Sequence, residues 1–255
     1  MDGKQRLVTP VLTAILVLLA ATPVFAASPP APARDGLPNL DRRAADPAAV
    51  PADTRAARSS LERSLGALAD VRTASGSGAV SYVGRATGVL TGPSSDDPRQ
   101  IALDYVRDHS DVFGLQKGDL ANLRLVARDV SPDGITHLRF NQVLDEIPSF
   151  DSGLEAHVAR DGRLINVAGA PVSGADLPTA TPALSALAGL GAARQAAQGS
   201  GVPPRQTAVE GGRRRITTFA TGERAQLRWI ATADGPRLAW HSITHGGDGR
   251  LYDVS

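Results

Sequence analysis

The chain has 255 residues, of which 42% are apolar, and a formal net charge of +1. This length and apolar content can supply one or two modest hydrophobic cores, and the near-zero charge gives no reason to expect nucleic acid as a partner. Aromatic residues make up only 4%, so the cores must consist mainly of small aliphatic side chains. The absence of cysteine excludes disulfides, a thiol protease, cysteine-ligated zinc and a lipid anchor on cysteine.

The N-terminus has the pattern of a secretory signal peptide. Two basic residues precede an apolar run from Val11 to Ala21, and the small residues Val24 and Ala26 fit the −3 and −1 positions of a cleavage site. A membrane anchor would need about 20 apolar residues, more than this run contains. We therefore expect a signal peptide over residues 1–26, cleavage after Ala26 or Ala27, secretion, and no membrane contact after cleavage.

Residues 27–58 are rich in proline and alanine and show no aliphatic periodicity, so they are expected to form a disordered leader. Arg42-Arg43 within this leader is either a processing site or ordinary solvated charge. After it, leucines at 61, 65 and 68 recur at helical spacing and predict a short helix that ends before Gly76.

Two short strands are predicted next, over residues 79–83 and 87–90. A second helix should begin at Asp97, which can cap it, with Pro98 at the first helical position and the helix ending near His109. Its apolar side carries Ile101, Tyr105 and Val106. A strand around residues 123–127 follows.

Three further strands are predicted between Thr136 and Gly169, and their parity defines a core face and a wet face. The hairpin signal Asp161-Gly162 places Val158 opposite Ile165 and Ala156 opposite Val167. Leu138 and Phe140 join the same core face only if even-numbered residues pair with even-numbered residues across the first hairpin. This pairing requires a loop with an odd number of residues. We expect a three-residue loop, 144–146, that pairs Phe140 with Phe150, or a bulge of equal effect, because a two-residue turn would set Phe140 opposite Asp151. The core face of the second strand then carries Phe150, Leu154, Ala156 and Val158, and its wet face carries Asp151, Glu155 and His157.

A second unit begins after Pro178. Thr181 is expected to cap a helix that runs to about Gln198, and Gly199 to Glu210 is expected to be a linker or an irregular strand. Leu227, Trp229 and Ala231 alternate, Asp234-Gly235 turns the chain, and Leu238 and Trp240 continue in a returning strand. The order of elements predicts an α+β protein of two small tandem units, each an antiparallel sheet packed on a helix. Leu251 to Ser255 fits one more strand, so this unit is expected to be truncated at its C-terminus.

The chain offers no convincing catalytic or metal-binding pattern. His241-Ser-Ile-Thr-His245 lacks the glutamate of His-Glu-x-x-His, so two surface histidines are preferred over a fortuitous metal site. Asp145-Glu146 suits a turn better than a pair of catalytic carboxylates, and Arg213 to Arg215 suits a solvated loop better than a basic patch or cleavage site. We expect no catalytic residue, no bound metal and no cofactor.

The stretch from Thr136 to Gly169, with the helix before it, resembles the propeptide domain of fungalysin- and thermolysin-type secreted zinc peptidases. The family usually has glycine where this chain has Glu146 and valine where it has Ser149. The glutamate in place of glycine argues against a tight two-residue turn. Residues from about 180 to 255 resemble the companion PepSY domain through the strands around Trp229 and Trp240. The resemblance to the propeptide domain rests on His137, Leu138, Arg139, Phe140, Gln142, Ile147-Pro148, Leu154, Asp161-Gly162 and Gly169.

The resemblance implies two cystatin-like units, a propeptide domain over 59–176 and a PepSY-like domain over 177–255. It implies that the chain is a secreted prosegment, an inhibitor and folding assistant whose partner is a fungalysin-like zinc metallopeptidase, in cis or in trans. Two alternatives stay open: a stand-alone extracellular module that binds proteases, and a truncated precursor that lacks its catalytic domain. Asp151, Glu155 and His157 are the candidate residues that face the enzyme.

Overall fold

The computed structural model describes residues 50–74, 77–174, 177–199, 202, 204–212, 214–232 and 235–255. The expected signal peptide with its cleavage site at Ala26 or Ala27, the first part of the leader, Arg42-Arg43, Arg213 and Asp234 lie outside these residues. The helices are α1 (Ala52–Leu65), α2 (Pro98–Asp108) and α3 (Ala186–Ala196), with short 3-10 helices η1 (Gly66–Leu68) and η2 (Lys117–Asn122). The strands are β1 (Ala69–Thr73), β2 (Val80–Arg85), β3 (Leu123–Val130), β4 (Thr136–Leu144), β5 (Ile147–Phe150), β6 (Leu154–Val158), β7 (Leu164–Ala168), β8 (Gln206–Glu210), β9 (Ile216–Phe219), β10 (Arg224–Thr232), β11 (Gly235–His245) and β12 (Leu251–Val254).

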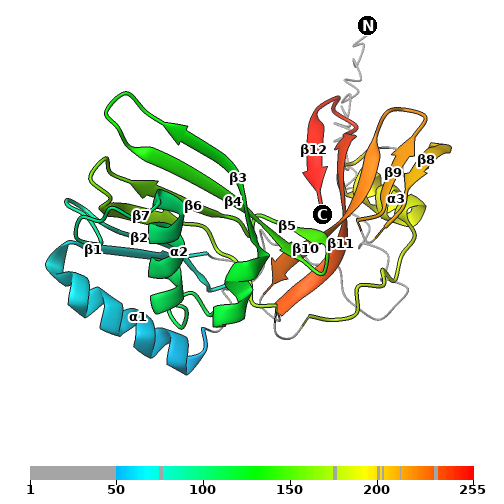
Figure 1. Cartoon of the computed structure of the whole chain (residues 1–255). Coiled ribbons are helices and arrows are strands. Elements are labelled where there is room, and N and C mark those ends of the chain that lie inside the picture. The colour runs from blue at the N-terminus through cyan, green and yellow to red at the C-terminus, as the bar shows by residue number, and fades with distance from the viewer. Residues whose placement is uncertain are drawn as a thin grey trace, which may run out of the picture. The chain divides into compact units, whose positions relative to one another are not determined.

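The described strands belong to one sheet, so the expected α+β class is confirmed. Its order is β1-β2-β7-β6-β4-β5-β10-β11-β12, with β3 beside β4, β9 beside β10, and β8 beside β9 (Figure 1). The pairing of β5 with β10 is parallel, whereas its neighbours β4 with β5 and β10 with β11 pair antiparallel. Strand β5 therefore joins the sheet of the first half of the chain to the sheet of the second half.

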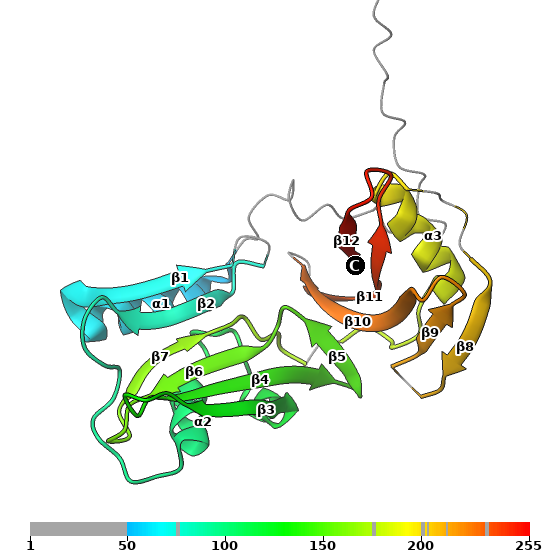
Figure 2. The same cartoon turned by 90° about the horizontal axis from the view of Figure 1, so that it is seen from above.

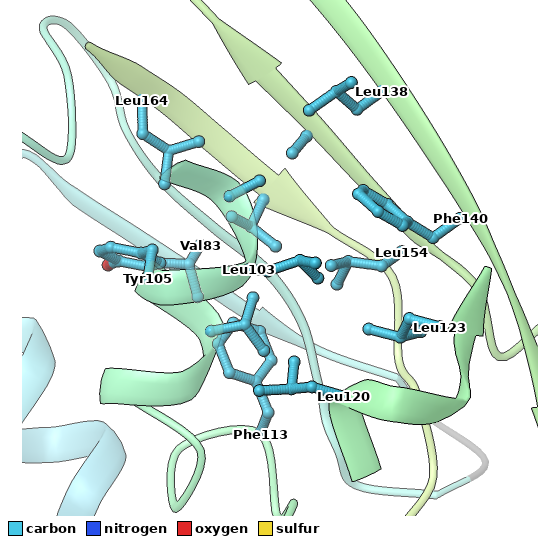
Figure 3. Close-up of a cluster of buried hydrophobic side chains, with 14 of the residues drawn as sticks. Val83, Leu103, Tyr105, Phe113, Leu120, Leu123, Leu138, Phe140, Leu154 and Leu164 are labelled. Atoms are coloured by element: carbon cyan, nitrogen blue, oxygen red, sulfur yellow. The ribbon is translucent and has the colours of Figure 1, made fainter. Parts of the chain in front are cut away.

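The largest core lies between α2 and the sheet formed by β2, β7, β6 and β4. Asp97 caps α2 through a hydrogen bond from the Arg99 N–H, with Pro98 in the first turn, as the sequence predicts. The buried face of α2 then meets Phe140, Leu154 and other apolar side chains of the strands (Figure 3). Because each of these side chains is removed from water, this cluster is the main source of hydrophobic stabilisation in the first half.

Two smaller cores lie in the second half. Trp229 is fully buried with Leu144, Ile147 and Leu227, and its indole N–H donates to the Leu144 carbonyl at 3.1 Å. Beneath α3, Leu190 packs with Phe219 and Ala225. The alternation predicted for the two tryptophan strands is confirmed, because Trp229 pairs with Leu238 and Leu227 pairs with Trp240.

The strand register of the first half differs from the expected one. Residues 145 and 146 form a two-residue turn with φ of 48° and 65°, and Leu144 pairs with Ile147. The three-residue loop and the pairing of Phe140 with Phe150 are therefore wrong. Residues 151–153 interrupt the second strand instead, so that β4 pairs first with β5 and then with β6, and Phe140 lies opposite Leu154. This three-residue break has the parity effect that the alternative bulge was expected to have.

The register expected for the second hairpin is confirmed at one residue pair and wrong at the other. Ala156 lies opposite Val167 as expected, but Val158 lies opposite Leu164 rather than Ile165. A bulge between these pairs shifts the register by one residue. The shift buries Leu164 completely and leaves Ile165 half-buried.

Several element boundaries also need correction. Helix α1 begins at Ala52, inside the segment expected to be a disordered leader, because its alanine and arginine content favours helix and Arg58 pairs with Glu62 one turn later. Residues 87–90 do not form a strand, and the partner of β2 is β1, which the sequence pattern did not predict. Helix α3 begins at Ala186 rather than directly after Thr181, because Ser185 and not Thr181 supplies the capping oxygen.

Candidate functional site

Strands β3, β4, β6 and β7 turn one face away from α2, and we call this face the outer face. Figure 2 looks onto it, with α2 behind the strands. Residues that lie directly opposite each other on neighbouring strands share a face of the sheet. The pairings Asp129 with His137, His137 with His157, and His157 with Asn166 therefore form one row across four strands.

Two histidines stand side by side in the middle of this row. The rings of His137 and His157 meet edge to face with their centroids 4.8 Å apart. A nitrogen of each ring is engaged by a neighbour: Nε2 of His137 lies 3.1 Å from Ser131 Oγ, and Nδ1 of His157 lies 2.7 Å from Asn166 Oδ1. Both rings are half-buried, so their edges are held in place and still reach solvent.

A second row of the outer face carries charge. Arg139 Nε donates to Glu155 Oε1 at 3.0 Å, with both side chains at least half exposed. The row continues through Ala168 to Tyr82, whose ring lies under the Arg72 guanidinium at 4.9 Å. Such exposed ion pairs add little stability, so this row is better suited to recognition than to holding the fold together.

The remaining family-signature residues have structural roles. Phe140 is fully buried in the main core, and Pro148 is buried in β5 opposite Val143. Gln142 is 1% exposed and forms two hydrogen bonds with the main chain of Val172, at 2.6 and 3.0 Å. A buried amide needs such partners, because an unpaired one costs free energy.

The Asp161-Gly162 turn is held against the segment that precedes α2. Gly162 has φ of 78°, and a Cβ atom at this position would lie 1.9 Å from the Ser94 carbonyl oxygen. Leu164 N–H also donates to Thr91 Oγ1 at 2.9 Å. The glycine is therefore required both by its backbone conformation and by the close approach of a second chain segment.

The structure brings together only part of the predicted enzyme-facing set. Glu155 and His157 lie on the outer face of β6, next to Arg139 and His137. Asp151 lies instead in the break between β5 and β6, exposed and with φ of 53°. The parity argument treated Asp151 as a strand residue, and the break removes it from that alternation.

Sequence reasoning missed several members of the outer face. Tyr82 and Arg72 come from β2 and β1, whose pairing with β7 and with each other is not visible in any local pattern. Asn166 lies on β7 opposite His157, where the register expected for the second hairpin already places it, although it was not named as a candidate.

His241 and His245 lie on β11. His241 Nε2 lies 2.7 Å from Asp253 Oδ1, and its ring packs 5.1 Å from the Phe150 ring. In the described part of the chain, no three His, Cys, Asp or Glu side chains cluster in a way that could hold a metal ion. Nor does any helix there have the length and apolar character to cross a membrane.

The outer face thus offers hydrogen-bonding edges and paired charges on a rigid sheet, which is the chemistry of recognition. A comparison with curated proteins found no match to the chain. A comparison with known protein families matches residues 121–177 to the Fungalysin/Thermolysin Propeptide Motif. The matched segment contains β3, β4, β5, β6 and β7, and therefore the whole histidine row and the Gln142 contact with Val172. This part of the chain is similar to a propeptide region of thermolysin- and fungalysin-type peptidases.

Proposed function

We propose that the chain is a secreted prosegment that inhibits a fungalysin-like zinc metallopeptidase and assists its folding. The observation that carries the proposal is the match of residues 121–177 to the propeptide motif, over a segment that forms a folded sheet. The expected signal peptide supports secretion, and the resemblance of residues 177–255 to PepSY supports the two-domain organisation of such prosegments.

The mechanism needs binding alone. A protein that binds only the native peptidase stabilises it by mass action, by about 2.7 kcal/mol at a concentration 100 times the Kd. Linkage in one chain would raise the effective concentration further. If the same contact covers the substrate cleft, folding assistance and inhibition arise from one interface.

We assign the enzyme-facing role to the outer face, with Glu155 and His157 in its centre and Asp151 at the adjoining break. The side chains of Glu155 and His157 reach solvent and are fixed by Arg139, His137 and Asn166 rather than by the core. Changing them should therefore alter recognition without unfolding the sheet.

Inhibition of a thermolysin-like peptidase by purified residues 28–255 tests the proposal. We expect inhibition at micromolar concentration and a higher yield of active enzyme when the denatured peptidase refolds in its presence. The double variant Glu155→Arg/His157→Ala should weaken inhibition at least about tenfold, since central interface residues contribute more than 1 kcal/mol. Arg55→Glu, an exposed change on α1, is the matched control and should leave inhibition unchanged. Absence of both inhibition and folding assistance would overturn the proposal.

A further inference from the structure

Gln226 and Arg228 lie on the face of β10 that is turned away from α3, and Arg214 of the neighbouring segment approaches them. Ala225, Leu227 and Trp229 point into the cores of the second half, so Gln226 and Arg228 lie on the opposite face. Arg214 lies just beyond the ladder that pairs Gln226 with Ile216, and its carbonyl accepts a hydrogen bond from the Leu227 N–H at 3.1 Å, next to Arg228. Two like charges thus lie near each other on neighbouring chain segments, and the charge of Arg214 acts on the Arg228 guanidinium.

These side chains carry buried donors without acceptors. Arg228 Nη2 donates to Gln226 Oε1 at 3.2 Å, but Arg228 Nε and Gln226 Nε2 are buried and have no hydrogen-bond partner in the described part of the chain. Nor does any hydrogen bond or ion pair engage the Arg214 side chain within that part. Buried donors left without an acceptor cost free energy, and the nearby charge of Arg214 adds to the cost.

Aromatic rings enclose the same spot. Phe150 lies on β5 and His241 on β11, which flank β10 on its two sides, and their rings approach to 5.1 Å. The two rings therefore meet over the strand that carries Arg228. Burial, and then the charge of Arg214, lower the pKa of the Arg228 guanidinium, and Asp253 partly opposes this effect. An anion beside Arg228 would accept hydrogen bonds from the unpaired donors and would offset the repulsion between Arg228 and Arg214.

We propose that Arg228, Arg214 and Gln226 form a binding site for a carboxylate, supplied by an acidic side chain of a partner protein. The free Nε edge of a guanidinium suits a planar carboxylate, which accepts two parallel hydrogen bonds. The described carboxylate at this margin, Asp253, is engaged with His241, and its negative charge favours a monovalent carboxylate over a phosphate dianion.

The apolar surroundings point to a protein as the source of the carboxylate. On the same face, Ile243 is 51% exposed on β11 and Leu251 is 64% exposed on β12. Exposed apolar side chains beside an arginine are typical of protein interfaces, in which arginine is enriched. The site lies on strands other than those of Glu155 and His157, and it does not rest on the proposed inhibition of a peptidase.

The test is a titration of isotopically labelled residues 28–255, followed through the arginine Nε–Hε signals. The probes are a blocked peptide with a central glutamate, the same peptide with glutamine, and inorganic phosphate. We expect the glutamate peptide to shift the Arg228 signal in a saturable manner and the glutamine peptide and phosphate to bind at least about tenfold more weakly, the size of one charge-assisted contact. Equal binding of the glutamine peptide, or stronger binding of phosphate, would overturn the carboxylate assignment.

Arg214→Ala is the informative variant, because this exposed side chain can be removed without disturbing the core. It should weaken binding of the glutamate peptide about fivefold. Arg224→Ala is the matched control, an exposed arginine of the same strand and the same face, and should change binding less than twofold. If both variants weaken binding equally, only general positive charge attracts the peptide and the site does not exist.

Discussion

Gln142 holds the main chain of Val172 with both ends of its side-chain amide. Its Nε2 donates to the Val172 carbonyl at 2.6 Å, and its Oε1 accepts from the Val172 N–H at 3.0 Å. The Gly174 N–H donates to the buried carboxylate of Asp119 at 2.9 Å, two residues further on. The segment after β7 is thus tied to the first half of the chain by buried side chains, and the family-signature glutamine acts as a structural clamp.

Replacing the clamp should destabilise the fold. Gln142→Leu fills the space but leaves the N–H and carbonyl of Val172 without partners, at a cost of about 2–3 kcal/mol. Urea unfolding measures this loss, and hydrogen exchange at the Val172 amide should speed up more than at amides of α2. Asn141→Ala, an exposed change on the same strand, should stay within about 0.5 kcal/mol. A Gln142→Glu variant as stable as the wild type would contradict the donor role of Nε2.

The Asp161-Gly162 turn should tolerate a Cβ atom poorly. Gly162→Ala strains a backbone with φ of 78° and sets the new atom 1.9 Å from the Ser94 carbonyl oxygen, so the neighbouring segment must move. Gly249 has φ of 77°, and a Cβ atom added there would have no atom within 4 Å, so Gly249→Ala isolates the cost of the backbone strain, about 1 kcal/mol. Thermal unfolding should show a clearly larger loss for Gly162→Ala. Equal losses would mean that the contact with Ser94 contributes nothing.

The strand register shows which part of the fold can be predicted from the sequence. The alternation of side chains required an odd number of unpaired residues in the hairpin that brings Phe140 opposite its partner. In the structure these are the three residues from Asp151 to Gly153, which separate β5 from β6. Parity fixes that number as odd but does not locate it, because side-chain alternation is the same whether the extra residues lie in the turn or beyond it. The family departure at Glu146 pointed to the turn, yet Asp145 and Glu146 both adopt positive φ there.

Other features depend on contacts between distant residues and leave no local pattern. The capped helix α2 and the tryptophan hairpin follow from short-range signals, and both were predicted. The parallel pairing of β5 with β10 joins residues about 80 positions apart, and Arg214 comes near Arg228 through a hydrogen bond between its carbonyl and the Leu227 N–H. Glu155 and His157 could be assigned to a wet face, but their neighbours on β1 and β2 could not.

Trp229 should be the most sensitive position at the junction of the two halves. Trp229→Phe removes the N–H that donates to the Leu144 carbonyl and leaves a gap among fully buried side chains, for a loss of about 2–4 kcal/mol. The unfolding free energy and hydrogen exchange in β5 check this. Trp240→Phe is the comparison, because Trp240 is only half-buried although it donates similarly to the Leu184 carbonyl at 2.8 Å. A larger loss for Trp240→Phe would contradict the central role of Trp229.

Glu223 gives the second half a defined dependence on pH. Burial alone would raise the pKa of its carboxyl, but hydrogen bonds from Arg194, Thr221 and Thr244, with the charge of Arg194, lower it to about 2. Glu223 is 9% exposed, and its carboxylate links α3 to β11 across the end of β10. The fold is therefore more stable with the carboxylate ionised than with it protonated.

Because the pKa in the folded state is below the usual value near 4.5, the stabilisation is complete above pH 4.5 and is lost as the pH falls toward 2. Its size is on the order of 3 kcal/mol, from 1.36 kcal/mol per pKa unit. Glu223→Gln should lower the unfolding free energy at pH 7 by a similar amount and flatten its fall between pH 4.5 and 2. Glu155→Gln, at an exposed ion pair, should change stability by less than about 1 kcal/mol and keep the wild-type pH profile. Urea unfolding over this pH range measures both, and a Glu223→Gln profile parallel to that of the wild type would show that another group controls the acid transition.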